Sequence, residues 1–226
     1  MKVTYYGHSC MGVNVNGVDL LFDPFITPNE LAKHIDINSV PADYILVSHG
    51  HEDHLADVQT IAERTGAKIV SNFEIVSWFA EKGLQNGHPM NHGGNWTFDF
   101  GTVQYVNAVH SSTLPDGKSG GNPGGFIVKT PEGTFYFAGD TALTKDMQLF
   151  GEQNEFSFVM LPLGDNFTMG IDDAVIAAEY LQCNRVIGMH YDTFPYIVID
   201  KNEAKTKFKE AGNELILIEI GKTVEL

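Results

Sequence analysis

The sequence predicts an α+β fold in which β-hairpins are followed by strand–helix units, and this order occurs twice along the 226 residues. The hairpin prediction starts from Asn16-Gly17, which separates two short apolar runs and is a strong signal for a tight turn between antiparallel strands. The strand–helix prediction starts from residues 44–47, an apolar run followed by apolar side chains at helical spacing up to Arg64. Gly66 then supplies a helix stop. Such alternation indicates βα units.

The first half of the chain carries the first occurrence of this order. Short apolar runs predict strands over residues 2–6, 13–15, 18–22, 44–47 and 68–70. Helical spacing predicts helices over residues 55–64 and 74–81. Residues 24–43, which contain proline, are expected to form a surface excursion, and residues 88–94 a loop.

The second half repeats the order. Hairpins are expected over residues 96–107, around Gly101, and over residues 126–138, around Gly133. The Ser-, Gly- and Pro-rich stretch 111–125 between them is expected to be a connection or a rim of the site. The remaining expected elements are strand 156–161, a helix from residue 172, strand 185–189, helix 203–211 and closing strand 215–220. No linker interrupts the pattern, so we expect one domain spanning residues 1–226.

Composition narrows the classes of function. Fourteen basic and 29 acidic residues give a net charge of −15, a field that repels nucleic acid and anionic membranes. Cys10 and Cys183 cannot form a disulfide framework, and no apolar run is long enough to span a membrane. We therefore expect a cytoplasmic protein that acts on a small molecule, with no nucleic-acid or membrane partner. A homo-oligomer is compatible with the sequence, which assigns no interface.

The most informative stretch is residues 48–54, Ser-His-Gly-His-Glu-Asp-His, between a predicted strand and a predicted helix. In extended backbone, side chains two residues apart point to the same side, so His49 and His51 can converge on one point. Asp53 and His54 follow where the chain turns and are expected at a neighbouring point. Imidazole binds zinc, copper, iron and nickel, and carboxylates bind harder ions. The stretch therefore predicts a site for one or two divalent metals rather than a solvated polar loop.

Three later strand ends carry further candidate ligands. His110 follows a predicted hairpin, and His190 follows the strand over residues 185–189. Asp140 follows a buried aromatic strand, where a carboxylate is costly unless it is paired or bound to metal. Asp23 ends an earlier strand, and an orienting role and a plain turn role are both open for it.

This order of ligands, His-x-His-x-Asp-His followed by His, Asp and His, resembles the signature of the metallo-β-lactamase superfamily. The closer resemblance is to the small single-domain metal-dependent hydrolases related to L-ascorbate-6-phosphate lactonase, and it covers essentially the whole chain. It is carried, besides the metal motif, by residues 6–10, 23–25, 138–141, 164–170 and 189–195. The resemblance implies an αββα sandwich, with two mixed sheets face to face, helices on the outer faces and metals at one edge.

The resemblance also implies a dinuclear centre. One metal would be held by His49, His51 and His110, and the second by Asp53, His54 and His190, with Asp140 bridging the two. Zinc suits the histidine-rich first site, and the second site suits Zn²⁺, Mn²⁺, Ni²⁺ or Fe²⁺.

The function expected from these residues is metal-dependent hydrolysis, in which a metal-bridged water attacks an ester-type bond, a lactone or a phosphodiester, in a small anionic molecule. Asp53 is the candidate catalytic residue, since it can orient that water and accept its proton. Four further residues are candidates for substrate contact, each with a structural loop role as the alternative: His8, Asn166, Tyr191 and Asp192. The alternative for the whole protein is a non-catalytic sensor that binds a metal or ligand on the same fold.

Overall fold

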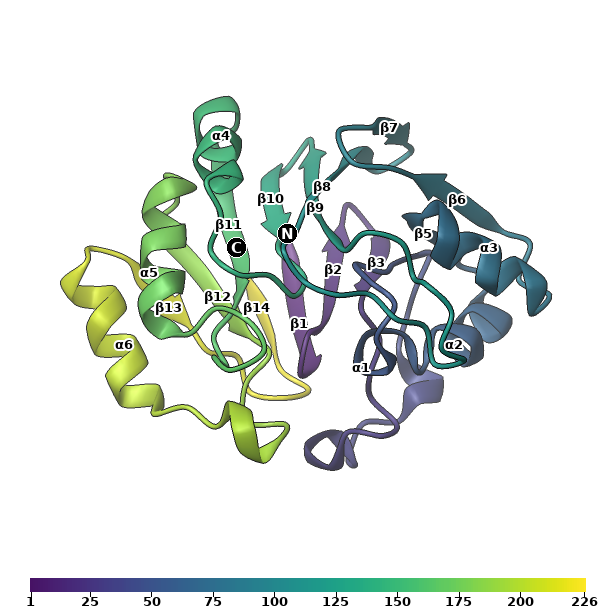
Figure 1. Cartoon of the computed structure of the whole chain (residues 1–226), viewed down its shortest axis with the longest axis horizontal. Coiled ribbons are helices and arrows are strands. Elements are labelled where there is room, and N and C mark those ends of the chain that lie inside the picture. Colours follow the sequence, from purple (N-terminus) through teal and green to yellow (C-terminus); the bar gives the residue numbers. More distant parts are fainter.

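Two mixed β-sheets of seven strands each pack face to face in the computed structural model, which describes residues 1–226 (Figure 1). Helices lie on the outer side of each sheet, so the layers run helix, sheet, sheet, helix (Figure 1). The αββα sandwich that the resemblance implies is therefore confirmed.

The first sheet comes mainly from the N-terminal half of the chain. Its strands are β1 (Lys2–Gly7), β2 (Cys10–Val15), β3 (Val18–Phe22), β4 (Tyr44–Leu46), β5 (Lys68–Asn72), β6 (Gly87–Met90) and β14 (Thr223–Glu225). They lie in the order β14-β1-β2-β3-β4-β5-β6. The predicted turn joins β2 to β3, and Asn16 and Gly17 both take left-handed backbone angles (φ 49° and 87°), as this hairpin turn requires.

The second sheet comes from the C-terminal half. Its strands are β7 (Asn95–Phe98), β8 (Gly101–Asn107), β9 (Gly124–Thr130), β10 (Gly133–Phe137), β11 (Phe156–Pro162), β12 (Arg185–Met189) and β13 (Glu214–Ile216). They lie in the order β13-β12-β11-β10-β9-β8-β7. Both predicted hairpins of this half are confirmed, since β7 pairs with β8 and β9 pairs with β10 in antiparallel register.

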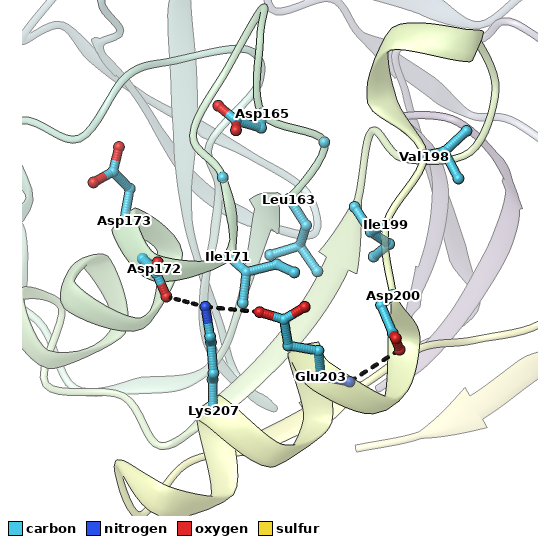
Figure 2. A pocket seen from close by; sticks show the side chains of 12 residues that line it. Leu163, Asp165, Ile171, Asp172, Asp173, Val198, Ile199, Asp200, Glu203 and Lys207 are labelled. Carbon is cyan, nitrogen blue, oxygen red and sulfur yellow. Dashed lines mark hydrogen bonds and ion pairs between the residues drawn. The ribbon is translucent and has the colours of Figure 1, made fainter.

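Six α-helices cover the sheets. They are α1 (Glu52–Leu55), α2 (Val58–Thr65), α3 (Phe73–Glu81), α4 (Asp146–Gln153), α5 (Ile171–Tyr180) and α6 (Lys201–Glu210). Helices α1 to α3 lie on the side of the first sheet, and α4 to α6 on the side of the second (Figure 1). Lys207 of α6 forms ion pairs with Asp172 of α5 at 2.7 Å and with Glu203 at 2.9 Å (Figure 2).

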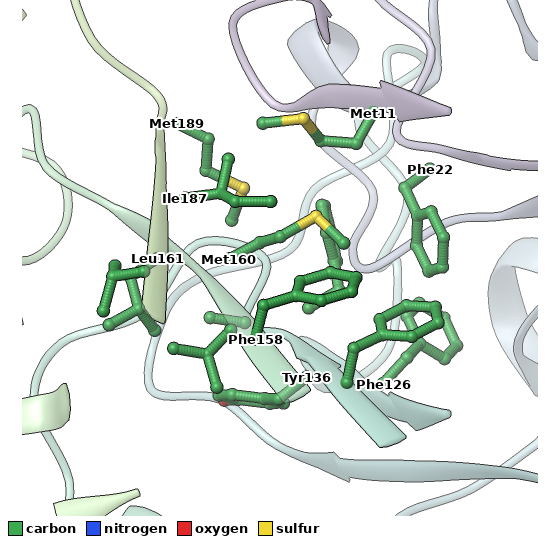
Figure 3. Close-up of a cluster of buried hydrophobic side chains, with 14 of the residues drawn as sticks. Met11, Phe22, Phe126, Tyr136, Phe158, Met160, Leu161, Ile187 and Met189 are labelled. Atoms are coloured by element: carbon green, nitrogen blue, oxygen red, sulfur yellow. The ribbon is translucent and has the colours of Figure 1, made fainter. Parts of the chain in front are cut away.

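The main core lies between the two sheets. Met11 and Phe22 of the first sheet face Phe126 and Phe158 of the second (Figure 3). The ring of Phe22 lies 4.8 Å from that of Phe137 and 6.1 Å from that of Phe126, measured between centroids. Burial of such rings supplies much of the free energy that holds the sheets together. The sheets are therefore fixed relative to each other, and so are the loops at their edges.

Strand direction decides where the candidate ligands gather. In the first sheet β1 and β3 run parallel, because each is antiparallel to β2, and β4 is parallel to β3. In the second sheet β8, β10, β11 and β12 run parallel to one another by the same reasoning. The carboxyl ends of these strands therefore lie at one edge within each sheet, and every candidate metal ligand follows one of them.

Three differences from the sequence prediction concern elements with weak local signals. Residues 88–94 were expected to be loop, but β6 pairs in parallel with β5 at the sheet edge, where Pro89 is tolerated. Helix α4 has no side-chain cap and contains Gly151, so no local signal predicts it. The expected closing strand 215–220 ends at Ile216, and the chain then crosses to the first sheet, where β14 pairs with β1.

None of these helices has both the length and the apolar character that crossing a membrane requires.

Candidate metal centre

The seven predicted ligands all follow the carboxyl ends of parallel strands. The loop after β4 and the first turn of α1 carry four of them, His49, His51, Asp53 and His54. The other three come from the second sheet, where His110 follows β8, Asp140 follows β10 and His190 follows β12. The structure thus brings together residues that are up to 141 positions apart in the sequence.

Asp140 lies at the middle of the group. Its Oδ2 atom is 2.9 Å from Nε2 of His190 and 3.2 Å from Nε2 of His54. The same oxygen is 3.5 Å from Nε2 of His110 and 3.9 Å from Nε2 of His49. One carboxylate oxygen therefore faces histidines of both expected metal sites, which is the placement a bridging ligand needs.

Three groups of donors have ligand atoms that lie within 4.8 Å of one another, and one of them is Asp23 with His49 and His54. The other two sets contain the candidate ligands of the two expected metal sites. The first set is His49, His51 and His110, and His49 Nε2 approaches His51 Nδ1 to 2.9 Å. The second set is His8, Asp53, His54 and His190. This division agrees with the one that the resemblance implies, except that His8 joins the second set.

Asp23 orients two of these histidines. It is fully buried and accepts hydrogen bonds from the Ser48 backbone amide at 2.7 Å and the Ser48 hydroxyl at 2.6 Å. Its Oδ2 atom also lies 2.8 Å from His54 Nδ1. Because the Ser48 hydroxyl proton goes to Asp23, Ser48 Oγ accepts from His49 Nδ1 at 2.9 Å. Both rings then turn Nε2 towards the centre, the usual effect of hydrogen bonds behind a metal ligand.

His8 lies behind Asp53. It is fully buried, its Nε2 is 3.0 Å from Asp53 Oδ2, and its Nδ1 is 3.0 Å from the Thr193 hydroxyl. Since an ionised carboxylate only accepts, Nε2 donates to Asp53. His8 therefore lies next to Asp53, and its ring orients that carboxylate.

The comparisons with known proteins decide the family. A family model described as the β-lactamase superfamily domain matches residues 2–190. The chain belongs to this superfamily. Two proteins named UPF0173 metal-dependent hydrolases, from Christiangramia forsetii and Methylacidiphilum infernorum, are 52% and 51% identical to it over the full length of both chains.

Two solved structures share the fold of this chain. Igni18, described as a novel metallo hydrolase from the archaeon Ignicoccus hospitalis, is 38% identical, with a TM-score of 0.91 over 99% of this chain and 97% of its own. An isothiocyanate hydrolase from Delia radicum gut bacteria is 17% identical, with a TM-score of 0.80 over 100% of this chain and 99% of its own. The second likeness shows the shared fold alone.

Charge and burial set the protonation of this superfamily member's site. Burial lowers the pKa of His49, His51 and His110, which favours the neutral ring that a metal ligand needs. Burial, together with His190, also lowers the pKa of His8 to about 4. Although burial opposes it, His190 and His54 hold the pKa of Asp140 well below its usual range, so this carboxylate stays ionised.

The donor set fits a divalent metal. Asp140 Oδ1 is buried and has no hydrogen-bond partner in the protein, and His54 Nε2 forms no hydrogen bond either, although Asp140 Oδ2 lies 3.2 Å from it. Leaving such an atom unsatisfied costs on the order of 1–3 kcal/mol, and a bound cation would satisfy both. Imidazole nitrogens with two carboxylates are the donors that zinc and neighbouring transition metals take.

A cavity of about 250 Å³ opens onto this centre. Five candidate ligands and three other residues line it: His51, Asp53, His110, Asp140, His190, Ser111, Phe167 and Phe194. No lysine or arginine is among them, so the cavity offers no basic side chain for the anionic substrate that the sequence led us to expect. Lys118 is the one basic residue in the stretch 111–125, and it pairs with Glu81 at 3.0 Å.

None of the four candidate substrate contacts lines this cavity. Tyr191 is buried against Tyr5, and Asp192 pairs with Lys201 at 2.8 Å, both on the wall of a different cavity. Asn166 is exposed beside Phe167. The loops 164–170 and 189–195 do reach the site, but through Phe167 and Phe194. The polar residues Asn166 and Asp192 were the expected substrate contacts, but the neighbouring phenylalanines line the cavity instead.

Proposed function

We propose that this protein is a metal-dependent hydrolase that uses two divalent ions, Zn²⁺ by preference, to cleave an ester-type bond in a small molecule. The observation that carries the proposal is the position of Asp140, whose Oδ2 lies within 4 Å of Nε2 atoms from four histidines. The names of the UPF0173 and Igni18 relatives support the same reaction class.

A bound metal pair would lower the pKa of a water molecule to roughly 7 and polarise the bond under attack. The protein supplies the rest through fixed side chains. Asp53 lines the cavity, and its Oδ2 is held by His8, which leaves Oδ1 without a protein donor. That free oxygen can accept a proton from the attacking water and return it to the leaving group. Asp53 is therefore the proposed general base.

The experiment is a hydrolysis screen with protein reconstituted with Zn²⁺ or Mn²⁺, using lactones, phosphodiesters and thioesters. We expect turnover that a chelator abolishes and that Asp53→Asn lowers by about 10²–10⁴-fold, the usual contribution of a positioned acid or base. Glu52→Gln is the matched control, because Glu52 is exposed, adjacent in sequence and absent from the cavity lining. It should leave both metal content and turnover unchanged.

Two outcomes would contradict the proposal. Turnover that survives chelation or Asp53→Asn would show that the reaction does not use this centre. Tight binding of a small molecule without any turnover would favour the sensor alternative instead.

A further inference from the structure

We infer that the site accepts an uncharged lactone or carboxylic ester whose aromatic or aliphatic group packs against Phe167 and Phe194. This inference rests on the proposed hydrolase function and adds the substrate class. It is based on the residues that line the cavity. Five of them are polar candidate metal ligands, and the two largest of the others are Phe167 and Phe194.

Phe167 is a hydrophobic side chain that the fold leaves in contact with solvent. Half of its surface is exposed, and its ring lies edge-on to that of Tyr196, 6.2 Å away between centroids. Tyr196 is itself 73% exposed. Two neighbouring exposed rings beside a polar cavity form a surface on which an apolar group can be buried.

The loop that carries Phe167 is strained and firmly anchored. Asp165 and Asn166 both have left-handed backbone angles (φ 60° and 52°), which non-glycine residues rarely adopt. The fully buried Met169 anchors the loop, because its amide donates to the Thr141 carbonyl and its carbonyl accepts from Asp165. These hydrogen bonds and backbone angles fix the loop that holds the Phe167 ring at the cavity.

Phe194 is equally fixed. Its ring lies 5.3 Å from the ring of His8 and 6.3 Å from that of Phe25. The preceding Asp192 has φ 64°, and its amide donates to the Ile197 carbonyl at 2.8 Å. The two phenylalanines are thus set in place before substrate binds, so little entropy is lost when it does.

The charges around the cavity disfavour an anionic group away from the metals. A carboxylate or phosphate beside Phe167 and Phe194 would lose water and gain no basic side chain, and aromatic faces repel anions. The same loop also borders an adjacent cavity of about 400 Å³ (Figure 2), and five carboxylates but a single lysine line it. Asp165 of that cavity lies two positions from Phe167.

Three lactones that share one ring test the inference: γ-phenyl-γ-butyrolactone, γ-carboxy-γ-butyrolactone and γ-butyrolactone. We expect the metal-loaded protein to prefer the phenyl compound over the carboxylate by about tenfold or more. Phe167→Ala should lower kcat/KM for the phenyl lactone about tenfold, chiefly by raising KM. The reason is that the lost ring contact stabilises the bound substrate and the transition state equally. It should change the value for γ-butyrolactone less than twofold.

Two further variants complete the design. Phe167→Leu should restore most of the selectivity, because it restores an apolar contact. Trp96→Ala is the matched control, since Trp96 is a similarly exposed aromatic residue (53%) on β7 and is not part of the cavity lining. It should leave all three lactones unaffected.

Binding separates failure of the inference from failure of the proposed function. Calorimetry with the metal-loaded protein should show 4-phenylbutanamide binding more tightly than glutaramate, and Phe167→Ala should remove the difference. That result without turnover of any lactone would reject the hydrolase and keep the binding preference. Equal or tighter binding of glutaramate, or preference for the carboxy lactone, would overturn the inference. The inference would also be overturned if Phe167→Ala changed the oligomeric state and left KM unchanged, because the ring would then contact a second copy of the protein rather than the substrate.

Discussion

Replacement of Asp23 tests whether this buried carboxylate orients the candidate metal ligands or only stabilises the fold. Asp23→Asn removes the oxygen that accepts from both the Ser48 hydroxyl and His54 Nδ1. The rings of His49 and His54 then lose their fixed orientation. We expect affinity for Zn²⁺ to fall by about 10–100-fold, as is usual when a hydrogen bond behind a metal ligand is removed. Competition with a chromophoric chelator measures this.

Asp57→Asn is the control for this prediction. Asp57 is also a buried carboxylate, but it accepts from the backbone amides of Ile26 and Thr27 and touches no candidate ligand. Its replacement should lower the free energy of unfolding and leave Zn²⁺ affinity unchanged. Equal losses of affinity in the two variants would mean that Asp23 acts only through stability.

At the scale of single residues, the sequence predicted which side chains would form the metal site, but not the hydrogen bonds that orient them. The spacing from His49 to His54 was informative because strand and turn geometry are local. The role of Asp23 stayed open, since it depends on Ser48 and His54, more than 20 positions away. The parts played by Phe167 and Phe194 were missed for the same reason, because exposure at a cavity is decided by the packing of distant loops.

Among the elements, the junction after β10 is packed closely against the loop that follows β4. Gly139 has φ 62°, and a Cβ atom there would lie 2.7 Å from Ser48 Cβ and 2.9 Å from the Gly124 carbonyl oxygen. Gly139→Ala must therefore displace Ser48, next to His49, as well as strain Asp140. We expect it to destabilise the fold by well over 1 kcal/mol and also to weaken Zn²⁺ binding. Chemical denaturation and chelator competition measure the two effects.

Gly66→Ala provides the matched comparison. Gly66 ends α2 with φ 75°, and no atom would lie within 4 Å of the added Cβ. The variant should cost about 1 kcal/mol from backbone strain alone and leave metal affinity intact. If both variants lost the same stability and neither lost affinity, close packing at Gly139 would not be coupled to the site.

Most elements could be predicted because their signals are local. The Asn16-Gly17 turn, the Gly66 helix stop and the apolar strands all appear where they were expected. Strands β6 and β14 could not be predicted, because each is a short edge strand whose identity depends on a partner elsewhere in the sheet. Pairing between β14 and β1 joins the two ends of the chain, a contact that no local window contains.

At the scale of the whole molecule, the site is a junction between the two sheets. The Ser48 carbonyl, from the first sheet, accepts from the Gly124 amide and the Tyr105 hydroxyl of the second. The His8 carbonyl accepts from the His190 amide at 2.8 Å. The candidate ligands themselves come from both sheets, so metal can bind only when the sandwich is assembled. Binding energy is then also folding energy.

Removal of metal should therefore lower the unfolding temperature of the entire chain in one transition. Free Zn²⁺ at 100 times its Kd stabilises by about 2.7 kcal/mol. In a chain of this size that corresponds to roughly 5–10 °C. Calorimetry with and without a chelator measures the shift. His190→Gln, which removes a ligand of the second sheet, should reduce the shift, and Glu52→Gln should not. The shift should also shrink as the pH falls well below 6.5, because protons then compete with metal for His49, His51 and His110, whose pKa burial lowers. An unfolding temperature that does not respond to chelation would show that the seven residues hold no metal that bridges the sheets.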